Sequence, residues 1–353
     1  VPYLSAAEEI KTKPTQHSVG MLRQAGIQPD ILICRTEKHI SAEIKEKLSL
    51  FCNVDRNAII EERDVKPYLY EIPLILVEQG LDKLIIQKLG LKTNGNTMHK
   101  WLSILDILKN PQQATEIAIV GKYICHQSSY ESIYESLIHG GIGNNARVRV
   151  RRVESEDIEK NGVQAHLEGV KGILVPGGFG VRGVEGKIAA IRYAREKNIP
   201  FFGICLGLQC ASIEFARNVC ALKGANSTEF EVNTPHPVIS LLEEQHKVSH
   251  KGGTMRLGAQ PCIIQPGTKA FNAYGREEIS ERHRHRYEFN NGYKEIFQSH
   301  GMIFSGRSPK DDLVEIMELK DHPWFLCVQF HPEFKSKPTS PHPLFKEFIR
   351  ASL

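Results

Sequence analysis

The spacing of hydrophobic positions changes near residue 115 of this 353-residue chain. From Thr115 onward, short apolar runs alternate with stretches in which apolar residues recur every three or four positions, which predicts strands alternating with helices. Such alternation favours an α/β fold with a mainly parallel sheet covered by helices, whose ligands bind at the carboxyl ends of the strands. The expected strands are 117–120, 148–153, 172–175 and 199–202, and the expected helices are 128–138, ended by Gly140-Gly141, then 185–197 and 206–217.

The first part of the chain has a different pattern and predicts a separate domain over residues 1–92. Residues 93–114 are polar at both ends and contain one short amphipathic stretch, 101–108, which is typical of an interdomain linker. The second domain then covers 115–353. Elements expected in the first domain are strands at 31–34, 51–54 and 58–60, a helix at 41–50 capped by Ser41, and helical spacing over 74–89 broken by Gly80.

Composition narrows the range of functions. Apolar residues make up 41% of the chain, which is enough for two packed cores, and the net charge of +4 is too small to indicate a nucleic-acid partner. No apolar run approaches the roughly 20 residues that a membrane span requires. The eight cysteines show no zinc-binding spacing, so we expect no metal site and no disulfide scaffold, and a reducing cytoplasm as the location.

Cys205 stands out because of its neighbours. It lies in Gly203-Ile204-Cys205-Leu206-Gly207, after an expected strand and at an expected helix start. Flanking glycines permit the sharp turn that exposes a nucleophile, and a helix N-terminus favours a thiolate. A cysteine after a strand is, taken alone, more often an inert core residue.

Two further motifs supply what a cysteine nucleophile needs. His331 and Glu333 are two positions apart, so in an extended segment they share one face and the carboxylate can orient the imidazole base. Backbone N–H groups of Gly178, in Pro176-Gly177-Gly178-Phe179-Gly180, and of Leu206 could stabilise an oxyanion. Alone, His-Pro-Glu is typically a turn and the glycine motif a tight loop, but the three motifs together favour acyl transfer.

These motifs resemble those of the class I glutamine amidotransferases, and the flanking sequence is similar to the CTP synthase family from the first residue to about Arg350. The segments that carry this narrower resemblance are 11–19 (KTKPTQHSV), 182–186 (RGVEG), 226–230 (NSTEF), 252–258 (GGTMRLG) and 282–288 (RHRHRYE). The resemblance implies a type 1 glutaminase domain over 115–353, preceded by the C-terminal part of a P-loop-type α/β amidoligase (synthetase) domain.

The resemblance also implies roles in the second domain. Cys205 would attack the side-chain amide of glutamine, with His331 as general base and acid and Glu333 as its orienting carboxylate, to release ammonia through a glutamyl thioester. Residues 282–286 could equally form a charged surface strand. The residues implied for the oxyanion hole and for holding glutamine are Gly178, Phe179, Leu206, Gln209, Glu229 and Arg286.

In the first domain the resemblance implies nucleotide contacts. Two lysines beside Thr12 and Thr15 could bind phosphate, although such a pair is more often part of a solvated loop. The residues implied for UTP, and for CTP as feedback inhibitor, are Lys11, Thr12, Lys13, Pro14, Thr15, Gln16 and Lys47; those implied for ATP are Arg63, Asp64 and Val65.

The implied reaction is ATP-dependent amination of UTP to CTP, with nitrogen from glutamine or free ammonia. ATP would phosphorylate the 4-oxygen of UTP, and ammonia would displace the phosphate. The resemblance further implies GTP as an activator, acting through residues 247–258, and a homotetramer.

One expected motif does not occur. The chain contains no G-x-x-x-x-G-K-[ST] and begins at Val1, so we expect the ATP-site half of the synthetase domain, with the Mg²⁺ ligands, to lie upstream, and this chain to retain only the glutaminase half. Two alternatives are a stand-alone γ-glutamyl hydrolase, which would have no use for residues 11–16, and a non-catalytic assembly or regulatory fragment, which would often have lost a triad residue.

Overall fold

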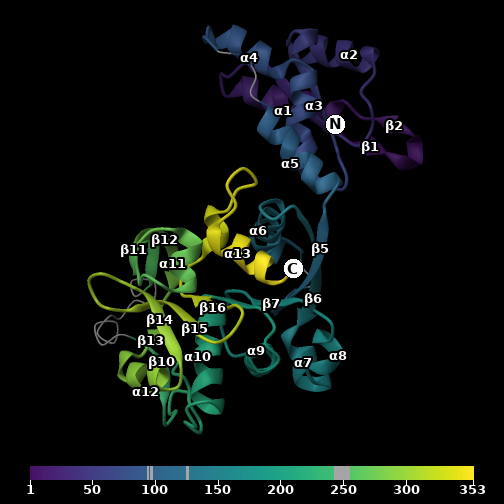
Figure 1. The fold of residues 1–353 in the computed structure, drawn as a ribbon. Helices are drawn as coiled ribbons and strands as arrows, with labels where there is room; N and C mark the ends of the chain where they lie inside the picture. The colour runs from purple at the N-terminus through teal and green to yellow at the C-terminus, as the bar shows by residue number, and fades with distance from the viewer. Residues whose placement is uncertain (94, 96–97, 125–126, 242–254) are drawn as a thin grey trace. The chain divides into compact units, whose positions relative to one another are not determined.

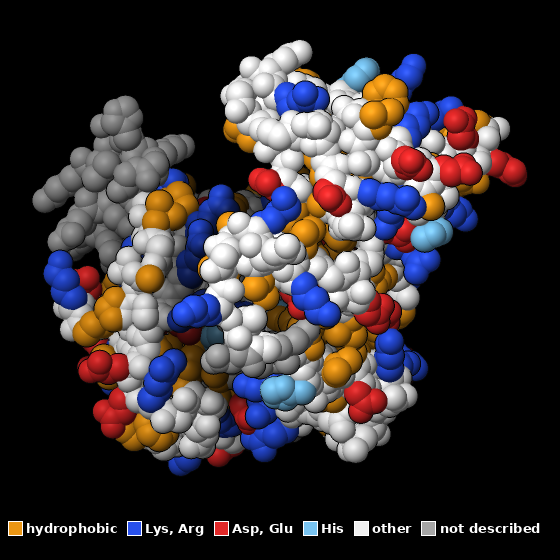
Figure 2. All heavy atoms as spheres, turned by 90° about the horizontal axis from the view of Figure 1, so that it is seen from above, with side chains coloured by type: hydrophobic (Ala, Val, Ile, Leu, Met, Phe, Trp, Pro, Cys, Tyr) orange, Lys and Arg blue, Asp and Glu red, His pale blue; other side chains and the backbone are white. Residues whose placement is uncertain are grey.

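The computed structural model describes residues 1–93, 95, 98–124, 127–241 and 255–353, which form two compact units, Val1–Asp106 and Ile107–Leu353 (Figure 1). Helix α5 (His99–Lys109) crosses the boundary between the units and contains the expected amphipathic stretch. None of the described helices is both long and apolar enough to cross a membrane. On the face seen in Figure 2, acidic and basic side chains are interspersed with apolar ones.

The first unit is built from two small sheets and short helices. Strand β3 (Leu32–Thr36) pairs in parallel with β4 (Ile59–Arg63), and β1 (Tyr3–Leu4) pairs antiparallel with β2 (Glu9–Ile10). The helices are α1 (Lys13–Gln24), α2 (Ala42–Cys52), α3 (Ile72–Glu78) and α4 (Leu81–Leu89). A small core unites Val19, Cys34, Leu48, Cys52, Ala58 and Ile59.

Local signals predict most of these elements but not the end of α2. Ser41 caps α2, because its hydroxyl accepts from the Ile44 N–H, and Gly80, at φ 77°, separates α3 from α4 as expected. The strand expected at 51–54 is wrong. Helix α2 continues to Cys52, which shares a buried face with Leu48 one turn earlier, and it ends at Asn53 in the left-handed conformation.

The second unit contains a nine-stranded mixed sheet in the order β12-β11-β14-β15-β16-β8-β7-β5-β6. The half from β16 to β6 is parallel, and the half from β12 to β16 is antiparallel. The α/β class is confirmed. The strands are β5 (Gln113–Gly121), β6 (Ala146–Glu154), β7 (Gly172–Val175), β8 (Phe201–Ile204), β11 (Arg256–Ile264), β12 (Glu278–His285), β14 (Met302–Arg307), β15 (Val314–Leu319) and β16 (Phe325–Val328).

Helices cover both faces of this sheet and enclose a separate core on each. Helices α6 (Glu131–Ile142), α11 (Lys269–Tyr274) and α13 (Pro343–Ala351) pack on one face, and α7 (Ser155–Asn161), α9 (Val184–Glu196) and α10 (Leu206–Asn218) on the other. The other α-helices and strands in the described part of this unit are α8 (Gln164–Leu167), α12 (Lys294–Ser299) and a three-stranded sheet of β9 (Asn226–Ser227), β10 (Pro237–Ser240) and β13 (Glu288–Phe289).

The glycines expected to end α6 lie inside it instead. A Cβ on Gly140 would come within 2.8 Å of the Phe345 carbonyl oxygen, and one on Gly141 within 2.6 Å of the Ala146 carbonyl oxygen. These glycines therefore let α6 approach α13 and β6 closely. The two glycines thus serve close packing between elements rather than ending the helix, and no local sequence pattern encodes that packing.

Candidate active site

Cys205 occupies a tight turn between β8 and α10. Its φ of 52° and ψ of −100° are strained for a residue with a side chain. Hydrogen bonds hold the turn on both sides: the Cys205 N–H donates to the Val328 carbonyl at 2.7 Å, and the Cys205 carbonyl accepts from the N–H groups of Leu208 and Gln209. The strand, turn and helix agree with the elbow that the sequence predicts.

The two flanking glycines are required by close packing. A Cβ on Gly203 would lie 2.9 Å from the carbonyl carbon of Gly207, and a Cβ on Gly207 would lie 2.2 Å from the Val175 carbonyl oxygen. Both distances are too short for any side chain, so glycine lets the start of α10 pack directly on β7.

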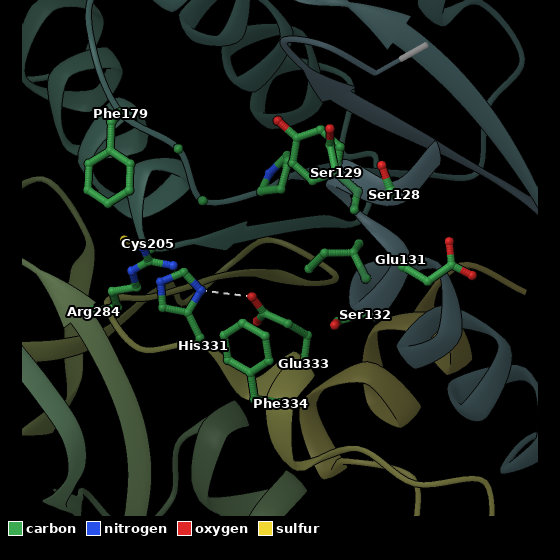
Figure 3. A pocket seen from close by; sticks show the side chains of 15 residues that line it. Ser128, Ser129, Glu131, Ser132, Phe179, Cys205, Arg284, His331, Glu333 and Phe334 are labelled. Atoms are coloured by element: carbon green, nitrogen blue, oxygen red, sulfur yellow. Dashed lines mark hydrogen bonds and ion pairs between the residues drawn. The ribbon is translucent and has the colours of Figure 1, made fainter. Parts of the chain in front are cut away.

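His331 and Glu333 form a buried hydrogen-bonded pair beside Cys205. Nδ1 of His331 lies 2.7 Å from Oε1 of Glu333, and Figure 3 shows the imidazole between that carboxylate and Cys205. The expected extended segment is wrong, since residues Pro332–Lys335 form a 3-10 turn. The turn folds the Glu333 carboxylate back onto the imidazole, and the Arg282 carbonyl fixes the His331 backbone by accepting its N–H at 2.8 Å.

The surroundings of His331 favour its protonated form. Burial, the largest single effect, lowers its pKa, but the Cys205 thiol and the Glu333 carboxylate together outweigh burial and raise the pKa to about 10. A protonated imidazole at neutral pH is the partner that a thiolate requires. Gly177 fits between the two groups, because a Cβ there would lie 2.8 Å from Cε1 of His331 and 3.5 Å from Cβ of Cys205.

Two pockets open beside Cys205. The larger, about 390 Å³, lies on the His331 side and is bounded by residues 128–133, the glycine loop at 176–179 and the side chains of Arg284 and Phe334 (Figure 3). The smaller, about 60 Å³, lies on the α10 side. Its lining consists of Gly178, Phe179, Cys205, Gln209, Glu229, Met255, His285, Arg286 and Tyr287.

The smaller pocket brings together residues that are far apart in the chain and that the resemblance assigned to glutamine. Glu229 also holds the glycine loop, because its Oε1 accepts from the Gly180 N–H at 3.1 Å. Leu206, whose backbone N–H the resemblance assigned to the oxyanion hole, is the first residue of α10, and its Cδ2 lies 3.2 Å from the position that a Cβ on Gly178 would occupy.

Three lining residues of this pocket were not singled out from the sequence: Met255, His285 and Tyr287. The signal was present, because each lies inside one of the recognised segments, 252–258 or 282–288. Most of the segment assigned to GTP, residues 247–254, lies outside the described residues.

The nucleotide candidates of the first unit fall into two places. Lys11 follows β2 and forms a 2.5 Å ion pair with Glu9, and the pKa of Glu9 is lowered by Lys11 and by Lys47 on α2. Both cations thus lie near one acid. Residues 12–16 lead into and form the first turn of α1, where Nε2 of Gln16 donates to the Thr12 hydroxyl at 3.1 Å.

The residues assigned to ATP follow the carboxyl end of β4. Arg63 is the last residue of that strand, and Asp64 and Val65 follow it in the loop. The Asp64 carboxylate accepts from Nε of Arg35 at 2.8 Å. Among the described residues, no group of three or more His, Cys, Asp or Glu side chains could hold a metal ion.

Comparison with known families agrees with this geometry. Residues 127–351 match the family model "Glutamine amidotransferase class-I", and residues 1–91 match the model "CTP synthase N-terminus". The chain therefore belongs to the class I glutamine amidotransferases. Because residues 1–91 carry a second domain, the expectation that the chain is reduced to its glutaminase half is not supported.

Individual relatives indicate which family within this class the chain belongs to. The chain is 56% identical to the CTP synthases of Moorella thermoacetica and Syntrophus aciditrophicus over its whole length, which covers 65% of each relative. A solved structure described as the Trypanosoma brucei CTPS glutaminase domain with bound acivicin aligns with a TM-score of 0.63 at 38% identity, covering 67% of this chain and 93% of that one. Within the class, the chain is a member of the CTP synthase family.

Proposed function

We propose that this chain hydrolyses glutamine at Cys205 and that the ammonia serves the ATP-dependent amination of UTP to CTP. The observation that carries the first half is the smaller pocket, in which Cys205 faces Gln209, Glu229 and Arg286 next to the His331–Glu333 pair. The second half rests on the match of residues 1–91 and on the relatives, of which the chain spans about 65%.

Charge explains how glutamine would bind. The substrate carries an α-ammonium group and an α-carboxylate, which suit the Glu229 carboxylate and the Arg286 guanidinium respectively. Phe179 and Gln209 would pack along the aliphatic part and orient the side-chain amide toward Cys205. A free amino acid with both charged groups is therefore favoured over a peptide.

The chemistry would take place in two steps. The Cys205 thiolate attacks the amide carbon, the N–H groups of Gly178 and Leu206 donate to the oxyanion, and protonated His331 gives its proton to the departing ammonia. Water then adds to the thioester while His331 accepts its proton, and collapse of the intermediate releases glutamate and the thiolate. Glu333 keeps the imidazole oriented through both steps.

In the synthetase reaction, ATP would transfer its γ-phosphoryl group to the 4-oxygen of UTP, and ammonia would add at that carbon and expel phosphate. UTP would lie at residues 11–16 and Lys47, which CTP would also contact as feedback inhibitor, and ATP would lie near 63–65. Mg²⁺ would accompany ATP, although the described residues offer no ligand set for it. We further propose that GTP activates the enzyme through residues 247–258, that the protein is a homotetramer and that it is located in the cytoplasm.

The test uses the full-length protein and measures glutamine hydrolysis and amination of UTP separately. Cys205→Ala should abolish both glutamate release and glutamine-dependent CTP formation, and leave ammonia-dependent CTP formation intact. Cys210→Ala is the matched control, since this buried thiol has a pKa raised to about 12 by burial and should be inert. Loss of ammonia-dependent synthesis in Cys205→Ala would contradict the division of labour.

A further inference from the structure

Gln329 is a buried residue that the mechanism above does not use, yet it touches the nucleophile. It follows the end of β16 and is fully buried. Its side-chain Nε2 donates a hydrogen bond to Sγ of Cys205 at 3.7 Å. An amide placed against a reacting sulfur inside the protein is in a position to influence the charge on that sulfur.

The direction of this hydrogen bond is determined by a second amide. Nε2 of Gln209 carries two N–H donors, and these reach the Tyr287 carbonyl at 3.2 Å and Oε1 of Gln329 at 3.5 Å. Gln329 therefore presents its oxygen to Gln209 and its NH₂ group to the sulfur. The resulting chain of hydrogen bonds runs from the wall of the smaller pocket to Cys205.

The backbone holds Gln329 and Cys205 in register. Strands β16 and β8 pair in parallel, with Val328 opposite Ile204, so the two residues follow neighbouring strand ends. The Cys205 N–H donates to the Val328 carbonyl, and the Gln329 N–H donates to the Glu315 carbonyl at 2.9 Å. The sheet therefore fixes the backbone positions from which the two side chains extend toward each other.

We propose that Gln329 is a further catalytic residue, whose side-chain N–H stabilises the Cys205 thiolate. The assignment deepens the proposed glutamine hydrolysis and rests on it for its catalytic role. A hydrogen bond to an anion is stronger than one to a neutral group, and burial strengthens it further. The donor therefore favours the thiolate over the thiol.

The same donor acts when the thioester is cleaved. Water adds to the thioester carbonyl, and the tetrahedral intermediate collapses by breaking its C–S bond, which returns the electron pair to sulfur. Gln329 then donates a hydrogen bond to the departing thiolate. Its hydrogen bond to the thioester sulfur is weaker, because that sulfur is neutral. The interaction is thus strongest where negative charge is on the sulfur, both before attack and after release.

The test measures the reactivity of Cys205 without glutamine. Wild-type protein and Gln329→Met, which keeps the side-chain length but removes the donor, are treated with iodoacetamide at a series of pH values from about 4 to 10, and alkylation of the Cys205 peptide is followed by mass spectrometry. We expect the pH at which alkylation is half-maximal to rise by about one unit in Gln329→Met, because without the donor the thiolate forms about tenfold less readily, which corresponds to about 1.4 kcal/mol. Ser212→Ala is the control, since Ser212 is buried on α10 but bonds to Leu208 and Met317.

Gln329→Leu provides a second variant, in which an apolar side chain of similar size likewise has no group that can donate to sulfur. It decides the question if Gln329→Met does not fold, and circular dichroism establishes folding for both. A folded variant of either kind whose alkylation follows the wild-type pH profile overturns the proposal. Because alkylation needs no glutamine, this result is independent of whether the chain hydrolyses glutamine. If it does, Gln329→Met should lower kcat for glutamine with little change in KM, as Gln329 does not line the pocket.

Discussion

Replacing Arg256 by Met should destabilise the second unit strongly. The guanidinium of Arg256 bridges two buried carboxylates, with Nη1 3.2 Å from Oε1 of Glu288 and Nη2 2.8 Å from Oε1 of Glu315. The side chains of the two acids are at most 1% exposed, and that of Arg256 is 17% exposed. Breaking such a pair from one side leaves a buried charge without a counter-ion, which is costly.

The expected magnitude follows from how many charges remain. Burial raises the pKa of Glu288 to about 8, although Arg256 opposes this, so Glu288 is largely neutral at pH 7. Removing Arg256 then leaves about one uncompensated carboxylate rather than two. We expect the free energy of unfolding of the second unit to fall by about 3 kcal/mol, the low end of the range for a buried ion pair that has lost one partner. For a unit of this size the corresponding fall in Tm is about 6–12 °C.

Tryptophan fluorescence provides the assay. The chain has two tryptophans, and in a Trp101→Phe background the buried Trp324 reports on the second unit alone. Thermal unfolding is compared for Arg256→Met and for Arg192→Met, which removes an exposed i,i+4 pair with Glu196 and should cost at most about 0.5 kcal/mol. A loss below about 1 kcal/mol for Arg256→Met would show that the buried acids do not depend on this cation.

Two further predictions concern the same unit. The folded-state pKa of Glu288 is raised above its usual value, so its contribution to stability is present at acidic pH and is lost as pH rises from about 4.5 through 8. Glu288→Gln should therefore flatten the fall in Tm between pH 5 and 9. An unchanged slope of Tm against pH would refute this. Gly207→Ala should abolish glutamate release, since its Cβ would lie 2.2 Å from the Val175 carbonyl oxygen, whereas Gly20→Ala in open space on α1 should be neutral or stabilising. Full activity in Gly207→Ala would contradict the packing of the elbow.

The sequence predicted the parts of the site that depend on local motifs. The turn at Cys205 follows from its two glycines, and the pocket around Gln209, Glu229 and Arg286 gathers residues from segments recognised beforehand. It could not predict Gln329 as a partner of Cys205. That contact depends on the parallel pairing of β16 with β8 across 124 residues of chain.

Errors in the predicted fold have the same origin. Residues 51–54 resemble a strand in isolation, but burial of Cys52 beside Leu48 extends α2 through them. The glycines of α6 resemble a helix end, but their absent side chains make room for α13 and β6. In each case a tertiary contact overrides a local preference.

The measurement that tests the central claim most directly is capture of the glutamyl thioester. Protein mixed with glutamine is quenched in acid within the first turnovers, and its peptides are analysed by mass spectrometry. We predict one glutamyl group on the peptide that contains Cys205, removable by hydroxylamine, absent in Cys205→Ala and retained in Cys210→Ala. Release of glutamate with no adduct on Cys205, or with the adduct on another residue, would contradict the account.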